Sequence, residues 1–214
     1  MDPLLAELYE RPDDPAAYVV YADALQSRGD PRGELIALQA ASVDATAYLS
    51  THPELGPPKV VRDLPFDPAT LPGDDIEWFC GFWKALRAFR LYNDDVEALL
   101  AHPSAQLLRR LSIRGTNQVT GDVCELAARY LARTLESISV SINSTGIYDD
   151  AYQALAPCTR LEAIFLYGDY EDCATLHALH AFPNLHELAM PLTLTDEACA
   201  ALVGIPVNSS CSAS

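Results

Sequence analysis

The chain contains 214 residues, of which 50% are hydrophobic, and its formal net charge at pH 7 is −16. This length is enough for a sizeable core in one or two domains. No apolar run approaches the roughly 18 residues of a membrane span, and the first residues lack a signal peptide, so we expect a cytoplasmic protein with no membrane partner. The negative charge also argues against nucleic acid as a partner.

The charge is unevenly distributed along the chain. Residues 1–84 and residues 135–214 each carry a net charge of −9. Residues 85–134, by contrast, include seven arginines and carry a net charge of +2. The middle of the sequence is therefore locally basic within an acidic molecule.

Three helices are predicted in the first fifty residues, each beginning at an Asp-Pro pair. The pairs lie at residues 2–3, 14–15 and 30–31, and each places a capping carboxylate beside a proline in the first helical turn. Gly29 is expected to end the second helix in the left-handed conformation. We therefore predict a small helical domain over residues 1–50.

Prolines and tryptophans characterise the segment that follows. Six prolines lie between residues 53 and 72, which excludes a regular helix there. Both tryptophans lie within residues 76–83, and we expect this segment to cover the apolar end of a repeat array. Residues 51–84 are thus predicted to be a Pro-rich connector followed by the N-terminal cap of a solenoid.

A motif of three aliphatic residues, spaced as in L-x-x-L-x-I, recurs in the second half of the chain. The four clear copies start at spacings of 27, 26 and 24 residues, within the period of roughly 20–29 residues that is typical of leucine-rich repeats. A fainter copy starts 22 residues earlier, at Leu86. The clear copies begin at Leu108, Leu135, Leu161 and Leu185.

Each motif predicts a strand whose aliphatic side chains point inward and whose alternate residues point outward. Amphipathic helices are predicted between the strands, so the strands should be parallel. The predicted fold class is α/β. Residues 85–207 should form a short leucine-rich-repeat solenoid with a parallel inner sheet and outer helices, and this solenoid is joined to the small N-terminal helical domain. Residues 208–214 should form a disordered tail. The helices are expected at about 95–101, 120–132, 149–156, 172–181 and 196–203.

The outward side chains of these strands form the predicted partner-binding surface. Along the chain they grade from arginines, through serines, to an aromatic pair. Arginine and tyrosine are enriched at binding hot spots, and adjacent exposed aromatic side chains favour a binding role. The alternative is that the arginines only balance nearby acidic residues. The candidate residues are Arg90, Tyr92, Arg110, Arg114, Ser139, Phe165, Tyr167 and Glu187.

No catalytic residue, cofactor or metal site is predicted. The sequence contains neither a G-x-S-x-G nucleophile motif nor a glycine-rich phosphate loop. The closest approach to a metal site is the pair His177 and His180, which follows Cys173, and we interpret these histidines as surface residues because no second ligand cluster accompanies them. The six cysteines are widely spaced and are expected to be reduced. We therefore expect that the protein is not an enzyme.

Residues 20–39 read VYADALQSRGDPRGELIALQ. This stretch resembles the signature of the bacterial repeat-companion domain, a VYADWLEERGDPRGEFIRLQ-like segment that precedes leucine-rich repeats. Ala24 stands where that family usually has tryptophan. The resemblance implies a helical companion domain fused to a repeat array, and it carries over no catalytic residue. The matching residues are Tyr21, Ala22, Asp23, Leu25, Arg28, Gly29, Asp30, Pro31, Arg32, Gly33, Glu34 and Gln39.

Two interpretations of this segment remain open. In the first, Gly29 ends one helix and ion pairs fix the corner that leads to the next helix. In the second, the start of the third helix binds an anionic group of a partner. The ion pairs of the first interpretation are expected among Asp23, Arg28, Arg32 and Glu34.

These features favour a non-catalytic protein-binding scaffold that uses the concave face of a leucine-rich-repeat array. The expected partner is another protein, and the chain is expected to be a monomer when it is unbound. The alternative is an acidic immunity or inhibitor protein that neutralises a basic toxin such as a nuclease, because acidic flanks would complement a cationic surface.

Overall fold

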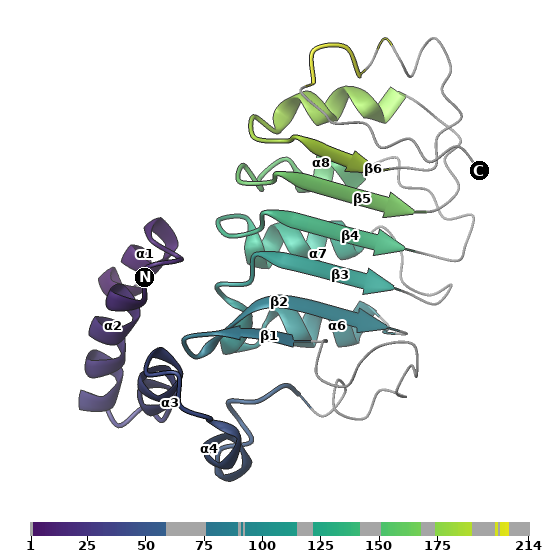
Figure 1. The fold of residues 1–214 in the computed structure, drawn as a ribbon. Coiled ribbons are helices and arrows are strands. Elements are labelled where there is room, and N and C mark those ends of the chain that lie inside the picture. The colour runs from purple at the N-terminus through teal and green to yellow at the C-terminus, as the bar shows by residue number, and fades with distance from the viewer. Residues whose placement is uncertain are drawn as a thin grey trace. The chain divides into compact units, whose positions relative to one another are not determined.

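The computed structural model shows a mixed α/β protein with a six-stranded, mostly parallel sheet (Figure 1). The strands follow one another across the sheet in sequence order, from β1 to β6. The predicted α/β class is therefore confirmed. The structure describes residues 2–58, 76–89, 91, 93–114, 122–141, 151–167, 174–189, 200 and 202–205.

The chain divides into two compact units. Unit 1 consists of residues 1–86 and 101–108, and unit 2 consists of residues 87–100 and 109–214. Unit 1 thus contains the predicted helical domain together with the predicted cap segment. Unit 2 contains the strands of the four clear aliphatic motifs.

The first two helices of unit 1 begin where the Asp-Pro pairs predict, and the third begins one residue later, at Arg32, whose N–H donates to the Asp30 carboxylate. The Asp2 carboxylate accepts a hydrogen bond from the backbone N–H of Leu4 at 3.0 Å, and Asp14 caps the second helix in the same way. Gly29 has a φ of +73° and ends the second helix, as predicted. A fourth helix, which the sequence pattern does not predict, follows the third. The helices are α1 (Pro3–Glu10), α2 (Pro15–Ser27), α3 (Arg32–Ala40) and α4 (Thr46–Thr51).

Unit 1 also contains the paired residues of an antiparallel hairpin, which the sequence pattern does not predict as a pair of strands. β1 (Ile76–Phe79) and β2 (Phe82–Phe89) are joined by two residues. These are Cys80 and Gly81, whose φ values of +45° and +81° are both left-handed. Two left-handed residues match the type I′ turn, whose twist suits a hairpin. The predicted Pro-rich connector lies largely outside the described residues, between residues 59 and 75.

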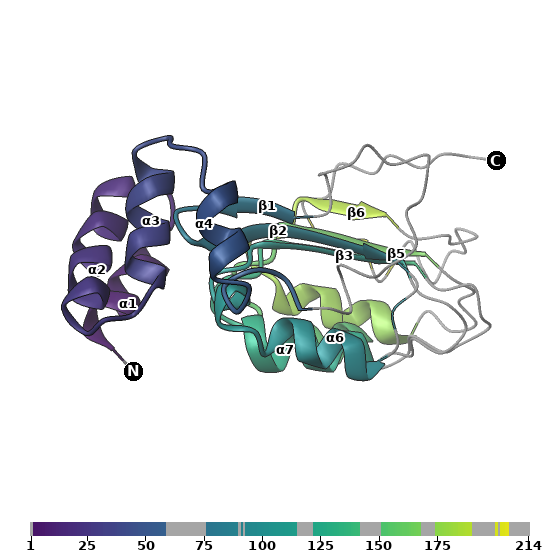
Figure 2. The ribbon, with the colours of Figure 1, turned by 90° about the horizontal axis from the view of Figure 1, so that it is seen from below.

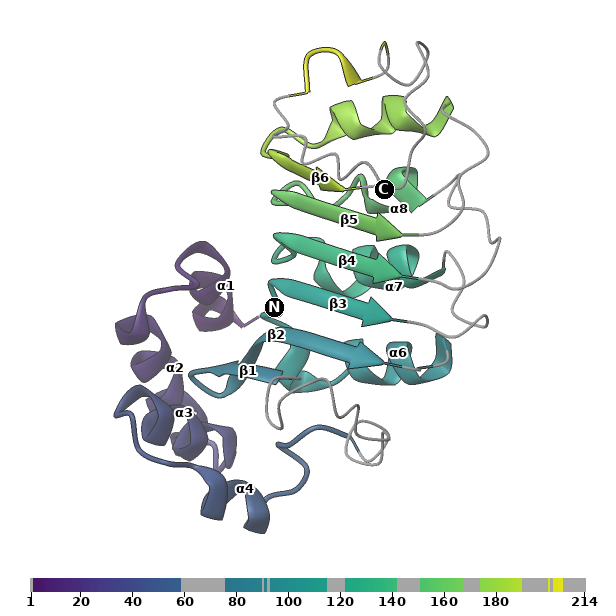
Figure 3. The same ribbon diagram turned by 45° about the vertical axis from the view of Figure 1, so that its right-hand side comes forward.

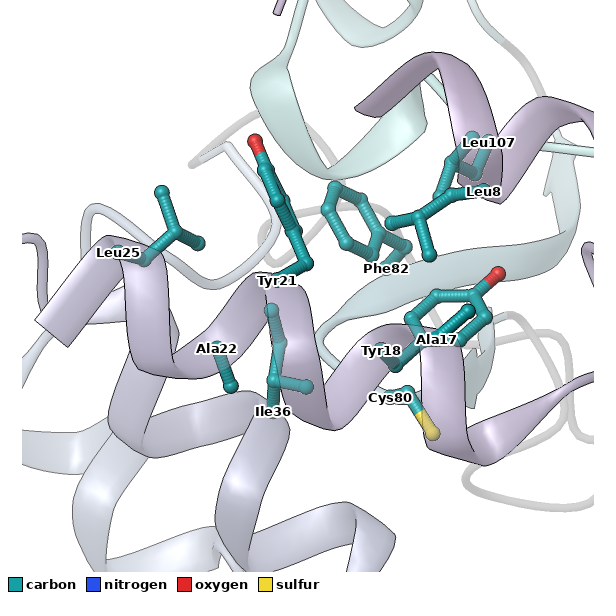
Figure 4. Packing of buried hydrophobic residues seen from close by; sticks show 10 residues of the cluster. All are labelled: Leu8, Ala17, Tyr18, Tyr21, Ala22, Leu25, Ile36, Cys80, Phe82 and Leu107. Atoms are coloured by element: carbon teal, nitrogen blue, oxygen red, sulfur yellow. The ribbon is translucent and has the colours of Figure 1, made fainter. Parts of the chain in front are cut away.

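The hairpin packs against the helices of unit 1 through aromatic side chains (Figure 4). The ring of Tyr21 stacks on that of Phe82 with 6.3 Å between centroids. The ring of Tyr18 meets that of Phe79 edge-on at 5.2 Å. Such pairs contribute about 0.5–1.5 kcal/mol each beyond the burial of apolar surface area. The helices and the hairpin therefore share one hydrophobic core.

Unit 2 contains parallel strands whose starts repeat at the spacings of the aliphatic motif (Figure 3). Consecutive strands pair in register, so that four aliphatic residues of the motif lie in one row across the sheet. All four are buried, and they are Leu111, Ile138, Ile164 and Leu188. The prediction that the aliphatic motifs lie on neighbouring parallel strands is therefore confirmed. The strands are β3 (Arg110–Arg114), β4 (Ser137–Ser141), β5 (Ala163–Tyr167) and β6 (Glu187–Ala189).

The helices of unit 2 lie on one face of the sheet (Figure 2). α6 (Asn93–Leu100) packs on α7 (Asp122–Leu131), and α7 packs on α8 (Ala151–Leu155). The next segment, predicted as an α-helix at 172–181, is instead the 3-10 helix η2 (Ala174–Ala181). A shorter 3-10 helix, η1 (Pro103–Ala105), belongs to unit 1.

Two predicted segments near the C-terminus lie mostly or wholly outside the described residues. They are the helix at 196–203 and the tail at 208–214. In the part of the chain that the structure describes, none of the helices combines the length and the apolar character needed to span a bilayer.

Candidate protein-binding face

Strand β4 sets the pattern of the candidate face, because its five residues alternate between serine and an aliphatic residue. The serines at positions 137, 139 and 141 are half-buried, whereas Ile138 and Val140 are buried. Alternation along a strand places the serines on the side opposite to the aliphatic core. The serines therefore lie on the outward side of the strand, as predicted.

The register of the parallel strands extends this pattern across the sheet. Ser139 pairs with Ser112 of β3 and with Phe165 of β5. Phe165 in turn pairs with Ala189 of β6. Adjacent strands are about 4.8 Å apart, so a row of four residues spans about 14 Å. We call the side of the sheet opposite to the aliphatic core, which is the predicted concave side, the outer face. Its residues on β3 to β6 are Arg110, Ser112, Arg114, Ser137, Ser139, Ser141, Ala163, Phe165, Tyr167, Glu187 and Ala189.

The two rows of four residues differ in charge. The first row has Arg110 and Glu187 at its ends, both exposed, with a serine and an alanine between them. The second row contains Ser139 and Phe165 as half-buried neighbours and has no charged residue. The outer face thus presents a cationic and an acidic end, joined by short neutral side chains.

For the remaining candidate residues, the structure describes either the backbone alone or nothing. Arg114 and Tyr167 occupy outward register positions on β3 and β5, with Ser141 between them. The side chains of Arg114 and Tyr167 lie outside the described part of the structure, as do the whole residues Arg90 and Tyr92. The register therefore brings six of the eight candidates onto the outer face, and four of these have described side chains.

An arginine beside the outer face is balanced by an acidic neighbour. Arg109 Nε donates to Glu136 Oε1 at 2.7 Å, and both side chains are only 16% exposed. Arg160 lies 3.6 Å from the same carboxylate oxygen. The alternative interpretation, in which arginines of the basic segment balance acidic residues, therefore applies to Arg109.

The residues considered for chemistry give no cluster in the described structure. Among the described residues, no three His, Cys, Asp or Glu side chains are grouped as metal ligands. His177 and His180 are both exposed on η2. Cys80, Cys124 and Cys158 are free and buried, and burial raises the pKa of Cys80 to about 11 and of the other two thiols to about 12. The thiolate form, which acts as nucleophile, is therefore disfavoured at neutral pH for all three.

The segment that resembles the family signature makes a different set of contacts from those predicted. Arg28 pairs with Asp2 at 2.7 Å, and Glu34 accepts a hydrogen bond from Gln26. Arg32 is only 5% exposed, and no described carboxylate lies within ion-pair distance of its guanidinium. The predicted ion pairs at this corner are therefore wrong, because Arg32 turns into the interior of unit 1.

Sequence reasoning missed the partners of Arg32. Its Nη1 group donates to the carbonyl oxygen of Gly81 and to Ser104 Oγ, both at 2.9 Å. These partners lie 49 and 72 residues further along the chain, so no local spacing indicates them. For the turn itself, the sequence offers only Gly81 as a signal, because the second residue of a type I′ turn is usually glycine.

The environment of His102, also in unit 1, predicts a dependence of stability on pH. The ring of His102 stacks on that of buried Trp83 with 4.8 Å between centroids. Its Nδ1 accepts a hydrogen bond from the Ser104 N–H at 3.1 Å, and its Nε2 lies 3.2 Å from the carbonyl oxygen of Glu54. Burial lowers the pKa of His102 and outweighs the contact with the Glu54 carbonyl oxygen, which raises it; the positive charge of Arg32 acts in the same direction as burial. The folded state therefore favours the neutral ring, and the unfolded state binds more protons below a pH of about 6.5.

We expect the free energy of unfolding of unit 1 to fall as the pH is lowered from about 7 to about 5. His102→Asn should flatten this response, because asparagine accepts a hydrogen bond at a helix start but does not titrate. Urea denaturation followed by tryptophan fluorescence measures unit 1, since both tryptophans lie in it. An unchanged pH response in the variant would assign the dependence to other groups.

The resemblance to the repeat-companion domain is carried by the residues at 20–39 and by the recurring aliphatic motif. No model of a protein family, no curated protein and no solved structure matches this chain.

Proposed function

We propose that this protein is a non-catalytic scaffold that binds another protein on the concave side of a leucine-rich-repeat array, which is the side formed by the outer face of β3 to β6. The observation that carries the proposal is the register of β3 to β6, which aligns the outward residues of four successive strands into rows. The strand starts are 27, 26 and 24 residues apart, which supports the repeat assignment. Repeats of this kind use an extended face as their binding surface.

The composition of the outer face suits contact with a protein surface. Its serines and alanines are short, so that a partner can approach the sheet closely. Phe165 and Arg110 are of the residue types that are enriched in the cores of interfaces. Because Arg110 and Glu187 carry opposite charges at the two ends of one row, ion pairs to a partner would fix its orientation.

Blocking the outer face is expected to abolish the capture of partners. Ser139→Arg places a long cationic side chain in the middle of the second row, where it would collide with a docked protein. Gln153→Arg is the matched control, because it adds the same charge at an exposed position of α8. We expect the amount of protein that the chain captures from cell extract to decrease at least about tenfold with Ser139→Arg, which corresponds to a loss of about 1.4 kcal/mol of binding free energy. Gln153→Arg should capture as much protein as the wild-type chain.

A second variant tests two other positions of the outer face, one on β3 and one on β5. Arg110→Glu combined with Tyr167→Ala should also abolish capture while leaving the melting temperature nearly unchanged. Quantitative mass spectrometry measures the captured proteins, and thermal denaturation followed by circular dichroism measures the melting temperature. Undiminished capture by Ser139→Arg and by this double variant would contradict the proposal and would move the binding surface to the helices or to the acidic segments.

The identity of the captured protein separates the scaffold from the inhibitor alternative. A cationic toxin that co-elutes and is released by salt would favour the inhibitor, because screening weakens the attraction between oppositely charged surfaces. Capture that is insensitive to salt would favour the scaffold.

A further inference from the structure

Two side chains of α3 hold the backbone of the hairpin turn in unit 1. Arg32 Nη1 donates to the carbonyl oxygen of Gly81 at 2.9 Å, and the N–H of Gly81 donates to Gln39 Oε1 at 2.8 Å. Both polar backbone groups of one turn residue are thus satisfied by side chains that lie at least 42 residues earlier in the sequence. The turn is therefore recognised through its main chain.

The surface around the turn accepts only glycine at position 81. Gly81 has a φ of +81°, a conformation that other residues adopt only with strain. A Cβ atom at this position would also lie 2.4 Å from Cγ1 of Ile36, which is fully buried in α3. Both the backbone conformation and the steric fit therefore select glycine.

The guanidinium of Arg32 is held in place by other groups of unit 1. The Nη1 group that contacts the turn also donates to Ser104 Oγ at 2.9 Å, and this hydroxyl donates in turn to the carbonyl oxygen of Leu55 at 3.0 Å. The guanidinium carbon lies 5.3 Å from the centre of the Phe82 ring, directly after the turn. Hydrogen bonds and a cation–π contact thus compensate for the burial of the charge.

We infer that the segment resembling the repeat-companion signature is a receptor for a β-hairpin turn. The turn receptor consists of Arg32, Ile36 and Gln39. Its target is a two-residue left-handed turn that ends in glycine and is followed by an aromatic residue. The companion helices thereby hold the first hairpin of the sheet, a role separate from the binding of partners by the outer face.

The close packing of α2 and α3 supports this role. A Cβ atom on Gly33 would lie 2.7 Å from the carbonyl oxygen of Ala22, so glycine allows α3 to approach α2 directly. Tyr21 of α2 stacks on Phe82 beside the turn (Figure 4). The signature residues of both helices therefore contribute to one surface that contacts the hairpin.

A double-mutant cycle between Gly81→Ala and Ile36→Ala tests the inference. Gly29→Ala is the matched control, because Gly29 is also left-handed, with a φ of +73°, but a Cβ there would meet nothing within 4 Å. We expect the control to raise the unfolding constant of unit 1 by about 5- to 30-fold, the effect of left-handed strain alone. Gly81→Ala should raise it by about 100-fold or more, because a steric clash is added.

In the Ile36→Ala background, Gly81→Ala should cost no more than the control, because the shortened side chain leaves room for the new methyl group. Urea denaturation followed by tryptophan fluorescence measures each variant. Equal effects of Gly81→Ala and Gly29→Ala would overturn the inference. Strict additivity of Gly81→Ala and Ile36→Ala would also overturn it.

A second measurement applies even if Gly81→Ala fails to fold. Gln39→Leu removes the acceptor for the Gly81 N–H, whereas Gln39→Glu keeps an acceptor at the same position. Hydrogen exchange of the Gly81 amide, followed by NMR, should accelerate at least about tenfold in Gln39→Leu and remain near the wild-type rate in Gln39→Glu. Wild-type exchange in both variants would exclude Gln39 from the turn receptor and overturn the recognition of the turn through its backbone.

Discussion

Replacing Ile164 with alanine is expected to lower the free energy of unfolding by about 2–5 kcal/mol. Ile164 is fully buried and lies in the row that also contains Ile138 and Leu188. The substitution removes buried methylene and methyl groups and leaves a cavity that the neighbouring strands fill only in part. Urea denaturation followed by circular dichroism would measure the loss.

Ser139→Ala provides the matched control for this prediction. Ser139 lies on the adjacent strand, and its half-buried side chain is on the outward side. Removal of its hydroxyl should change the free energy of unfolding by no more than about 0.5 kcal/mol. Similar losses for Ile164→Ala and Ser139→Ala would contradict the division of the sheet into a buried and an outer face.

Arg32→Ala is expected to destabilise unit 1 by about 3 kcal/mol or more. The substitution removes two hydrogen bonds that a charged donor makes, and it leaves the carbonyl of Gly81 without that donor. The substitution also removes the contact with the Phe82 ring. Tryptophan fluorescence during urea denaturation would report the change, since both Trp78 and Trp83 belong to unit 1.

Arg28→Ala is the control within the same segment. Arg28 is exposed and pairs with Asp2 at the surface, where water screens the interaction, so its removal should matter far less. Arg32→Lys should give an intermediate loss, because lysine keeps the charge but not the planar geometry of the guanidinium. If Arg28→Ala were as destabilising as Arg32→Ala, the buried contacts of Arg32 would not be the source of the stability.

The outer face was largely predictable because its geometry is local. In a strand, alternate residues point to opposite sides, so the S-I-S-V-S sequence of β4 already separates serines from aliphatic residues. Constant spacing of the motifs then predicts that neighbouring strands align. The rows that join Arg110 to Glu187 and Ser139 to Phe165 follow from these two regularities.

The sequence by itself determined the start of the first two helices, the end of α2 at Gly29 and the positions and register of the parallel strands. Each of these depends on residues that are close in the chain or on a simple period. Only the tertiary structure decided that Arg32 is buried, that Gln39 and Ile36 contact a hairpin turn and that position 81 requires glycine. The physical reason is that these contacts join residues 42 to 72 positions apart, so they depend on how the helices pack on the hairpin and not on any local pattern.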